Sequence, residues 1–149
     1  MFLPYREITG KIIGCAMKVH NKMGSGYREK IYSRCLAIEL ERAGLNFQSE
    51  VDYPIEYDGI VVGKRIVDYI VESKVPLELK AIKELTDKEL NEGLNYLESH
   101  NMETGLLINF GGESLEFKRL FNKKFRSDNH ANPVNQINPG PNPGSNPWL

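Results

Sequence analysis

The segment VPLELKAIKEL, residues Val75 to Leu85, begins as a short apolar strand that contains two charged residues, Glu78 and Lys80. Successive side chains of a strand point to opposite faces, so Glu78 and Lys80 share one face while Leu77 and Leu79 share the other. A buried charge is costly unless it is paired or bound to a ligand. The segment therefore predicts a strand whose leucines enter a core and whose charged face meets a partner or a ligand.

Two helices are predicted before this strand. Apolar residues recur every three or four positions between Ile8 and Met23, and the glycines of MGSG end this first helix. A second helix is predicted within residues 27–44, with Gly44 just past its C-terminus. Its predicted buried row consists of Ile31, Cys35 and Ile38, with Leu36, Leu40 and Ala43 on adjoining rows. The two segments together predict a helical hairpin.

The pattern then changes from a helical period to alternation. Strands are predicted for residues 46–57 and 60–71, joined by an Asp58-Gly59 turn. Pro54 has no backbone N–H to donate, so the first of these strands is predicted to lie at a sheet edge or to carry a bulge.

A third helix and two further strands are predicted after the central strand. Thr86 and Glu89 have the spacing of a capping box, which begins the helix. The segments TGLLINFGG and SLEFKRLF have the length and apolar pattern of strands. The order α-α-β-β-β-α-β-β predicts an α/β or α+β fold, with helices packed on a mixed sheet.

Composition excludes several classes of protein. The chain has 149 residues, 40% of them hydrophobic and 26% charged, which is typical of one globular domain. No apolar run approaches the roughly 20 residues that span a bilayer, and the N-terminus does not resemble a secretory signal, so a cytoplasmic location is expected. The ordered domain is predicted to cover residues 5–125, followed by a disordered tail rich in Asn, Pro and Gly at residues 126–149.

The formal net charge of −1 excludes a strongly basic nucleic-acid binder, so any contact with nucleic acid has to be local. The segment FKRLFNKKFR, residues 117–126, could supply a basic patch among aromatic residues. The other interpretation of this segment is a solvated basic tail.

A carboxylate in the second strand of the hairpin, Asp68, adds to the charged pair of the central strand. If these two strands pair, Asp68 lies beside Glu78. Two converging carboxylates and water are the ligands that a hard divalent cation such as Mg²⁺ requires. The alternative is a buried structural ion pair between Glu78 and Lys80.

An Asp on the second strand followed by Glu-x-Lys on the third resembles the core of the PD-(D/E)xK nuclease superfamily. GYREKIY, with Gly26, Glu29 and Tyr32, resembles the motif of the small bacterial GxxExxY family. LELKAIKEL, LNYL and GLLINFG also resemble segments of that family, and the similarity covers about residues 8–120. The resemblance implies a restriction-endonuclease-like core with a central mixed sheet of four to five strands flanked by helices.

The resemblance also implies a set of site residues. The implied metal ligands are Asp68, Glu78, the backbone carbonyl of Leu79 and Glu29. Glu29 would otherwise be an exposed first-turn residue that suits the helix dipole. The implied role of Lys80 is to hold the attacking water and to offset negative charge on the phosphate, while the metal-bound water becomes the nucleophile.

One position departs from the pattern of RecB-like members of this superfamily, which carry Gln-x-x-x-Tyr on the following helix. The matching residues here are Glu92 and Tyr96, predicted to contact substrate. An ionised Glu92 would repel phosphate, so it either adds a metal ligand or weakens the site. Tyr96 lies on the same helical face, and ordinary packing is its alternative role.

The function that these residues favour is a nuclease that uses Mg²⁺ or Mn²⁺ to hydrolyse phosphodiester bonds of DNA or RNA. The alternative is a catalytically weak or inactive module of the same fold that binds nucleic acid or a protein partner. The predicted edge strand could also pair with a second copy of the chain in a homodimer. The sequence does not distinguish DNA from RNA, or endonuclease from exonuclease cleavage.

Overall fold

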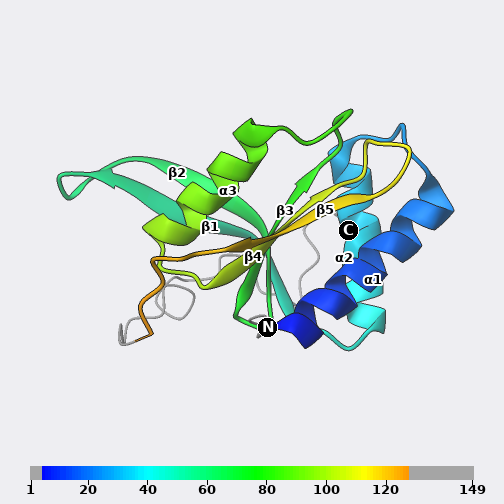
Figure 1. The fold of residues 1–149 in the computed structure, drawn as a ribbon, viewed down its shortest axis with the longest axis horizontal. Coiled ribbons are helices and arrows are strands. Elements are labelled where there is room, and N and C mark those ends of the chain that lie inside the picture. The colour runs from blue at the N-terminus through cyan, green and yellow to red at the C-terminus, as the bar shows by residue number, and fades with distance from the viewer. Residues whose placement is uncertain (1–4, 128–149) are drawn as a thin grey trace.

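The computed structural model of this chain describes residues 5–127 and has the predicted order of elements (Figure 1). These elements are α1 (Arg6–Met23), α2 (Glu29–Arg42), β1 (Phe47–Tyr57), β2 (Ile60–Val71), β3 (Val75–Lys80), α3 (Asp87–Ser99), β4 (Thr104–Asn109) and β5 (Glu116–Phe121). The five strands form one sheet in the order β1-β2-β3-β4-β5. Only β3 and β4 pair in parallel among these strands, so the sheet is mixed. The predicted α/β fold class is confirmed, and the topology is consistent with a restriction-endonuclease-like fold.

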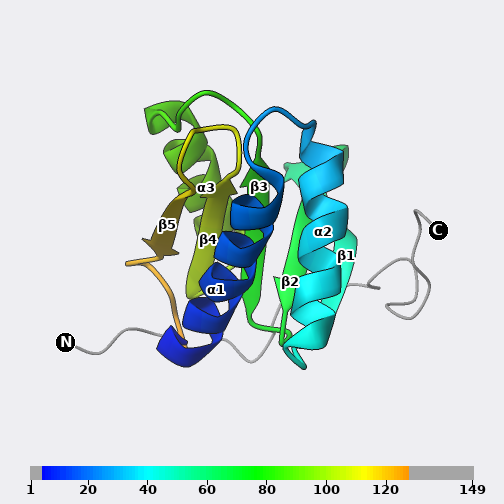
Figure 2. The ribbon, with the colours of Figure 1, turned by 90° about the vertical axis from the view of Figure 1, so that its right-hand side faces the viewer.

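The helices cover the sheet on both faces. Figure 2 shows α1 and α2 in front of the sheet and α3 behind it. In residues 5–127, no helix is both long enough and apolar enough to cross a membrane. From residue 128 onward the predicted tail lies outside the described residues, and its disorder stays a prediction.

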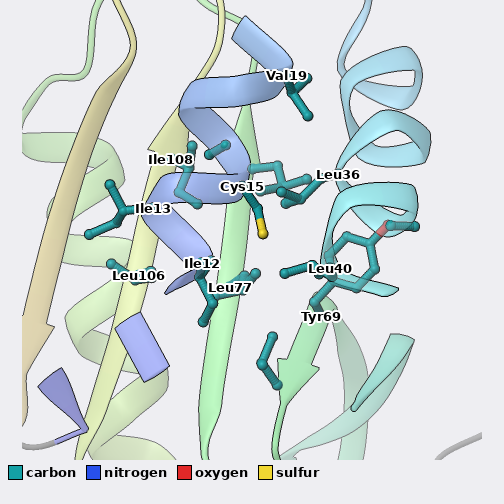
Figure 3. Packing of buried hydrophobic residues seen from close by; sticks show 14 of the residues in the cluster. Ile12, Ile13, Cys15, Val19, Leu36, Leu40, Tyr69, Leu77, Leu106 and Ile108 are labelled. Carbon is teal, nitrogen blue, oxygen red and sulfur yellow. The ribbon is translucent and has the colours of Figure 1, made fainter. Parts of the chain in front are cut away.

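The leucines of the central strand enter the core as predicted. Leu77 and Leu79 are almost fully buried in the cluster between the sheet and the α1–α2 layer. Figure 3 shows Leu77 among side chains from α1, α2 and β4, including Ile12 and Leu40. A second cluster lies under α3 and contains Leu97 of that helix. The central strand is therefore fixed by packing on one face, which leaves Glu78 and Lys80 on the other.

The predicted buried row of α2 is wrong. Ile38 is 50% exposed, whereas Tyr32, Leu36 and Leu40 are fully buried. Leu36 and Leu40 come from the adjoining apolar row of the prediction, so the buried face of α2 is rotated toward that row. Tyr32 can be buried because its hydroxyl donates to the carbonyl of Gly24. Glu29 is three residues before Tyr32, so the corrected row places Glu29 on the face that packs toward the sheet.

The hairpin of β1 and β2 is confirmed, including its turn. Asp58 and Gly59 have φ values of 50° and 78°, as an Asp-Gly hairpin turn requires. β1 is an edge strand, so Pro54 interrupts no ladder on its outer side. The far end of the hairpin extends beyond the helices in Figure 1.

The loop between β3 and α3 is held by a buried asparagine on β4. Asn109 Oδ1 accepts the N–H of Ile82 at 2.9 Å, and Asn109 Nδ2 donates to the carbonyl of Ile82 at 3.0 Å. Asn109 Nδ2 also donates to Glu116, whose carboxylate accepts the N–H of Leu85. Thr86 and Glu89 then form the predicted capping box that begins α3. This network fixes where α3 starts relative to the end of β3.

The backbone at Gly111 lies very close to the backbone at Ile82 in the loop after β3, which leads to a testable prediction about stability. A Cβ atom added at Gly111 would lie 2.1 Å from the carbonyl oxygen of Ile82. Gly111→Ala should therefore lower the free energy of unfolding by about 1–3 kcal/mol or more, because the backbone has to shift. Urea denaturation measures the change.

The matched control is Gly14→Ala. Gly14 lies within α1, and an added Cβ meets nothing within 4 Å. This variant should raise the free energy of unfolding by up to about 1 kcal/mol, since Ala is the better helix former. Equal effects of the two substitutions would contradict the described packing around Gly111.

Candidate metal centre

The candidate centre lies where β2 and β3 stop pairing. Their antiparallel ladder has three pairs and ends at Tyr69 and Leu77. One further step in this register would place Asp68 opposite Glu78. Instead of a backbone carbonyl of β2, the carboxylate Oδ2 of Asp68 accepts the N–H of Leu79 at 2.7 Å. The side chain of Asp68 thus continues the contact between the strands after the backbone ladder has ended.

The backbone of Leu79 faces this gap with its carbonyl as well. In an extended strand, the N–H and C=O groups of one residue point to the same side. The N–H of Leu79 points to Asp68, and the next residue, Lys80, accepts a bond on the β4 side from the N–H of Phe110. The carbonyl of Leu79 is therefore directed toward the Asp68 carboxylate, while its side chain remains in the core.

β1 adds a backbone irregularity opposite Asp68. Glu50 has a φ of 52°, and it lies between the pairs Ser49–Tyr69 and Val51–Val67. Regular alternation would keep Tyr69 and Val67 on one face of β2, yet Tyr69 packs under α1 and α2 whereas Val67 packs under α3. Asp68 thus lies at a twist in the hairpin, between Val67, which faces α3, and Tyr69, which faces α1 and α2.

Burial makes the two strand carboxylates harder to ionise. Desolvation raises the pKa of Glu78, and the neighbouring Asp68 raises it further. Desolvation also raises the pKa of Asp68, against the opposing effect of the hydrogen bond from Leu79. The Lys80 ammonium lowers the pKa of both groups, but less than burial raises it. The two carboxyl groups are close enough to repel each other when both are charged.

Glu29 belongs to the same group of charges. It is the first residue of α2, and it raises the pKa of both Asp68 and Glu78. Its own pKa is raised by partial desolvation of the carboxyl group, although the residue as a whole is exposed. Glu29 comes from the α1–α2 layer, whereas Glu78 faces the α3 layer. The Glu29 carboxylate is nonetheless close enough to both strand carboxylates to disfavour their ionisation.

The spacing of Gly26, Glu29 and Tyr32 in the GxxExxY segment follows from the way the loop before α2 is held. Gly26 has a φ of 114°, a value that favours glycine, in the loop before α2. The hydroxyl of Tyr32 accepts the N–H of Tyr27 at 3.2 Å and donates to the carbonyl of Gly24. The Tyr32 ring stacks on Phe110, with centroids 4.8 Å apart. A core side chain thus ties down the loop that delivers Glu29.

The side chains fit a hard divalent cation by chemistry. The carboxylates of Asp68 and Glu78 and the carbonyl of Leu79 are oxygen donors, which Mg²⁺ prefers, and a cation would relieve their mutual repulsion. Within residues 5–127, however, no three His, Cys, Asp or Glu side chains are grouped closely enough to hold a metal ion. Glu29 would therefore have to move toward the strand carboxylates to become a third carboxylate ligand.

A pocket of about 310 Å³ opens beside this centre, between the sheet and α3. Glu78 and Lys80 both line it, which confirms that they share a face. Glu92 of α3 lines it too, and its Oε2 is 4.0 Å from Lys80 Nζ. The Glu92 carboxylate thus attracts Lys80 toward α3. The sequence predicted that Glu92 lies near the site, but it did not predict this ion pair.

Tyr96, the second predicted substrate contact, is mostly a packing residue in this structure. It is 2% exposed, and its ring packs edge to face against Tyr53 with centroids 5.2 Å apart. It still lines the pocket beside Glu92. The glycine between them, Gly93, allows close packing of α3, since an added Cβ would lie 2.5 Å from the Leu120 side chain.

Sequence reasoning missed two charged residues near the centre. Glu50 raises the pKa of Asp68 from the neighbouring strand, and Arg65 lowers the pKa of Glu78 and lines the pocket. Arg65 carried a usable signal, because apart from Asp68 it is the one charge in the strand segment RIVDYIV. Glu50 carried none, since its position depends on the local twist of the hairpin.

Comparison with known proteins identifies the superfamily of the chain. A family profile described as the PD-(D/E)XK nuclease superfamily matches residues 6–120. The chain belongs to this superfamily. The match spans all the residues of the candidate centre, but it does not name the GxxExxY family, so that narrower resemblance stays a prediction. No curated protein and no solved structure gives a significant match.

The raised pKa values predict how the stability of this superfamily member depends on pH. Because folding raises the pKa of Glu78, the unfolded chain ionises this group first, and stability falls as pH rises above about 4, the ordinary value of an exposed glutamate. Glu78→Gln removes this loss. The stability of the metal-free variant relative to wild type should therefore increase between about pH 5 and pH 8, as measured by urea denaturation in EDTA.

Glu56→Gln, on the exposed part of the hairpin, is the control for removing one carboxylate. Its effect on stability should stay nearly constant over the same range. A Glu78→Gln effect that is equally constant would mean that Glu78 is not held in a desolvated position.

Tyr32→Phe tests the anchoring of the loop before α2. The variant keeps the ring stack on Phe110 but removes the hydroxyl that accepts the Tyr27 N–H and donates to Gly24. Loss of these bonds should cost about 1–3 kcal/mol and should speed hydrogen exchange at the Tyr27 amide. Hydrogen exchange of the β3 amides should become faster only by the amount that the loss of global stability explains. Unchanged protection of Tyr27 would show that the hydroxyl does not hold the loop.

Proposed function

We propose that this PD-(D/E)XK superfamily member is a Mg²⁺- or Mn²⁺-dependent nuclease that hydrolyses phosphodiester bonds of DNA or RNA. The observation that carries the proposal is the position of the Asp68 carboxylate, which accepts the N–H of Leu79. Asp68 and Glu78 are also the next pair in the register of the β2–β3 ladder, directly beyond its last pair. Superfamily membership supports the same reaction class. The proposed metal ligands are Asp68, Glu78, the carbonyl of Leu79 and, after a movement of its side chain, Glu29.

The metal ion, when bound, would acidify a water molecule and offset the negative charge of the phosphate. Asp68 is held for this role by its bond to Leu79, which fixes the carboxylate at the strand gap. Lys80 lies on the pocket side of β3 beside Glu78, where its ammonium can orient the attacking water and stabilise charge that develops on the phosphate. Asp68, Glu78, Lys80 and Glu29 are thus the proposed catalytic group.

Glu92 favours the second candidate function, a weak or inactive nuclease-fold module that binds nucleic acid or a protein partner. Its carboxylate attracts Lys80 away from the proposed water-binding role and would repel a phosphate in the pocket. The near-zero net charge of the chain is also poor for general nucleic-acid binding. We keep Glu92 and Tyr96 as proposed substrate contacts because both line the pocket next to Lys80.

Cleavage assays with labelled single-stranded and duplex DNA and RNA, in Mg²⁺ or Mn²⁺, separate these functions. For a nuclease, Glu78→Gln and Asp68→Asn should each lower the cleavage rate by about 10²- to 10³-fold, because each removes a charge used in the transition state. Each variant should remain folded by circular dichroism.

Glu92→Gln is the matched control, since it removes a carboxylate from the same pocket. It should raise the cleavage rate by up to about fivefold, because a half-exposed ion pair with Lys80 contributes no more than about 1 kcal/mol. A wild-type protein that binds Mn²⁺ and nucleic acid but cleaves no substrate would support the inactive module. A wild-type protein that binds no divalent cation would overturn the metal-dependent nuclease.

A further inference from the structure

The pocket beside the candidate centre contains an arginine with no part in the proposed chemistry. Arg65 of β2 lines this pocket together with Glu78, Lys80 and Glu92. It is partly buried, and it comes from β2, the strand next to the Glu-x-Lys strand β3. A cation placed there has to serve either the fold or a ligand.

The guanidinium of Arg65 is held in place from two directions. Its Cζ lies 5.7 Å from the centroid of the Tyr96 ring, and its Nη2 donates to Oδ1 of Asn95 at 3.2 Å. Stacking on an aromatic ring and a hydrogen bond limit the rotamers of a long side chain. Ordering the side chain before a ligand arrives removes part of the entropy cost of binding.

The chemistry of the pocket suits a phosphate group when a cation occupies the neighbouring centre. Arg65 and Lys80 supply two positive charges to the pocket, and a cation at the neighbouring centre would offset the charge of Glu78. The Glu92 carboxylate, which also lines the pocket, lies 4.0 Å from Lys80 Nζ. Glu89 also lines the pocket, but its carboxylate accepts the N–H and hydroxyl of Thr86 in the helix cap. Arginine presents N–H groups in a planar fork that matches phosphate oxygens, whereas only one of its five donors is used by Asn95.

The remainder of the pocket wall is apolar. Ile66, Gly93, Leu107 and the ring of Tyr96 complete the lining. A recess of about 310 Å³ whose wall includes two cations and several apolar groups can take a phosphate together with its attached sugar. This combination is typical of a substrate subsite rather than of a structural ion pair.

We propose that Arg65 binds a phosphate of the nucleic-acid strand next to the one that is cleaved, in the pocket between β2, β3 and α3. This subsite rests on the proposed nuclease function. It adds a residue that holds the substrate strand without acting on the scissile phosphate.

The test is nucleic-acid binding by the full chain with Arg65→Gln, and with Lys64→Gln as the matched control. Lys64 is the adjacent residue of β2, and it is 62% exposed and paired with Asp52 at the surface. Both variants lose one positive charge, so they have the same effect on the net charge. Binding of a labelled single-stranded oligonucleotide is measured by fluorescence anisotropy in Ca²⁺, at a concentration that saturates each variant. The oligonucleotide is recovered afterwards to verify that it is intact.

Arg65→Gln should weaken binding by about tenfold or more, as expected for the loss of a charge-assisted contact, and should reduce the slope of log affinity against log salt by about 0.7. Lys64→Gln should change the affinity by less than about twofold. Arg65→Lys should recover only part of the affinity, because lysine keeps the charge but loses the fork. Equal affinities of Arg65→Gln and Lys64→Gln would overturn the subsite.

Two further results separate this proposal from the nuclease function. A wild-type protein that cleaves nucleic acid, with unchanged binding in Arg65→Gln, would overturn only the subsite. A wild-type protein that binds no nucleic acid in the presence of a divalent cation would overturn both.

Discussion

The hydrogen bond from the Leu79 N–H to the Asp68 carboxylate is the interaction on which the candidate centre depends. A buried backbone N–H needs an acceptor, and at most places in a sheet the acceptor is a carbonyl of the next strand. Here β2 and β3 end their ladder at Tyr69 and Leu77, and a side-chain carboxylate takes the place of that carbonyl. The sheet thus opens without leaving the N–H unpaired, and it brings a negative charge to the opening. The carbonyl of Leu79 faces the same gap for the same geometric reason.

The position of the charges follows from the packing of their neighbours. Leu77 and Leu79 are buried against the α1–α2 layer, so alternation directs Glu78 and Lys80 toward the pocket under α3. The same core stacks Phe110 on Tyr32, whose hydroxyl ties down the loop before Glu29. Asn109, also on β4, fixes the loop that leads to α3 and hence to Glu92. The free energy gained by hydrophobic burial offsets the repulsion between several like charges held at one place. A bound divalent cation would reduce that repulsion.

Most of the fold could be predicted from the sequence because its patterns are local. The period of α1, the Asp58-Gly59 turn and the capping box at Thr86 each identify an element or its end within a few residues. The buried row of α2 could not be chosen, because two rows have helical spacing and the hydroxyl of Tyr32 finds its partner only in the folded loop. Asp68 and Glu78 could be predicted as neighbours because the strand register is simple. Glu50 and the Lys80–Glu92 pair could not, because they depend on hairpin twist and on the approach of α3.

A crystal soaked with Mn²⁺ tests most directly whether Asp68 and Glu78 form a metal centre, since the anomalous scattering of manganese locates the ion independently of activity. The expected result is a peak in the gap between β2 and β3, with carboxylate oxygens of Asp68 and Glu78 and the carbonyl oxygen of Leu79 at coordination distance. The same peak should be absent from a soaked crystal of Asp68→Asn. Manganese bound elsewhere, or a gap in which Glu78 pairs only with Lys80 at saturating Mn²⁺, would contradict a metal centre at this position.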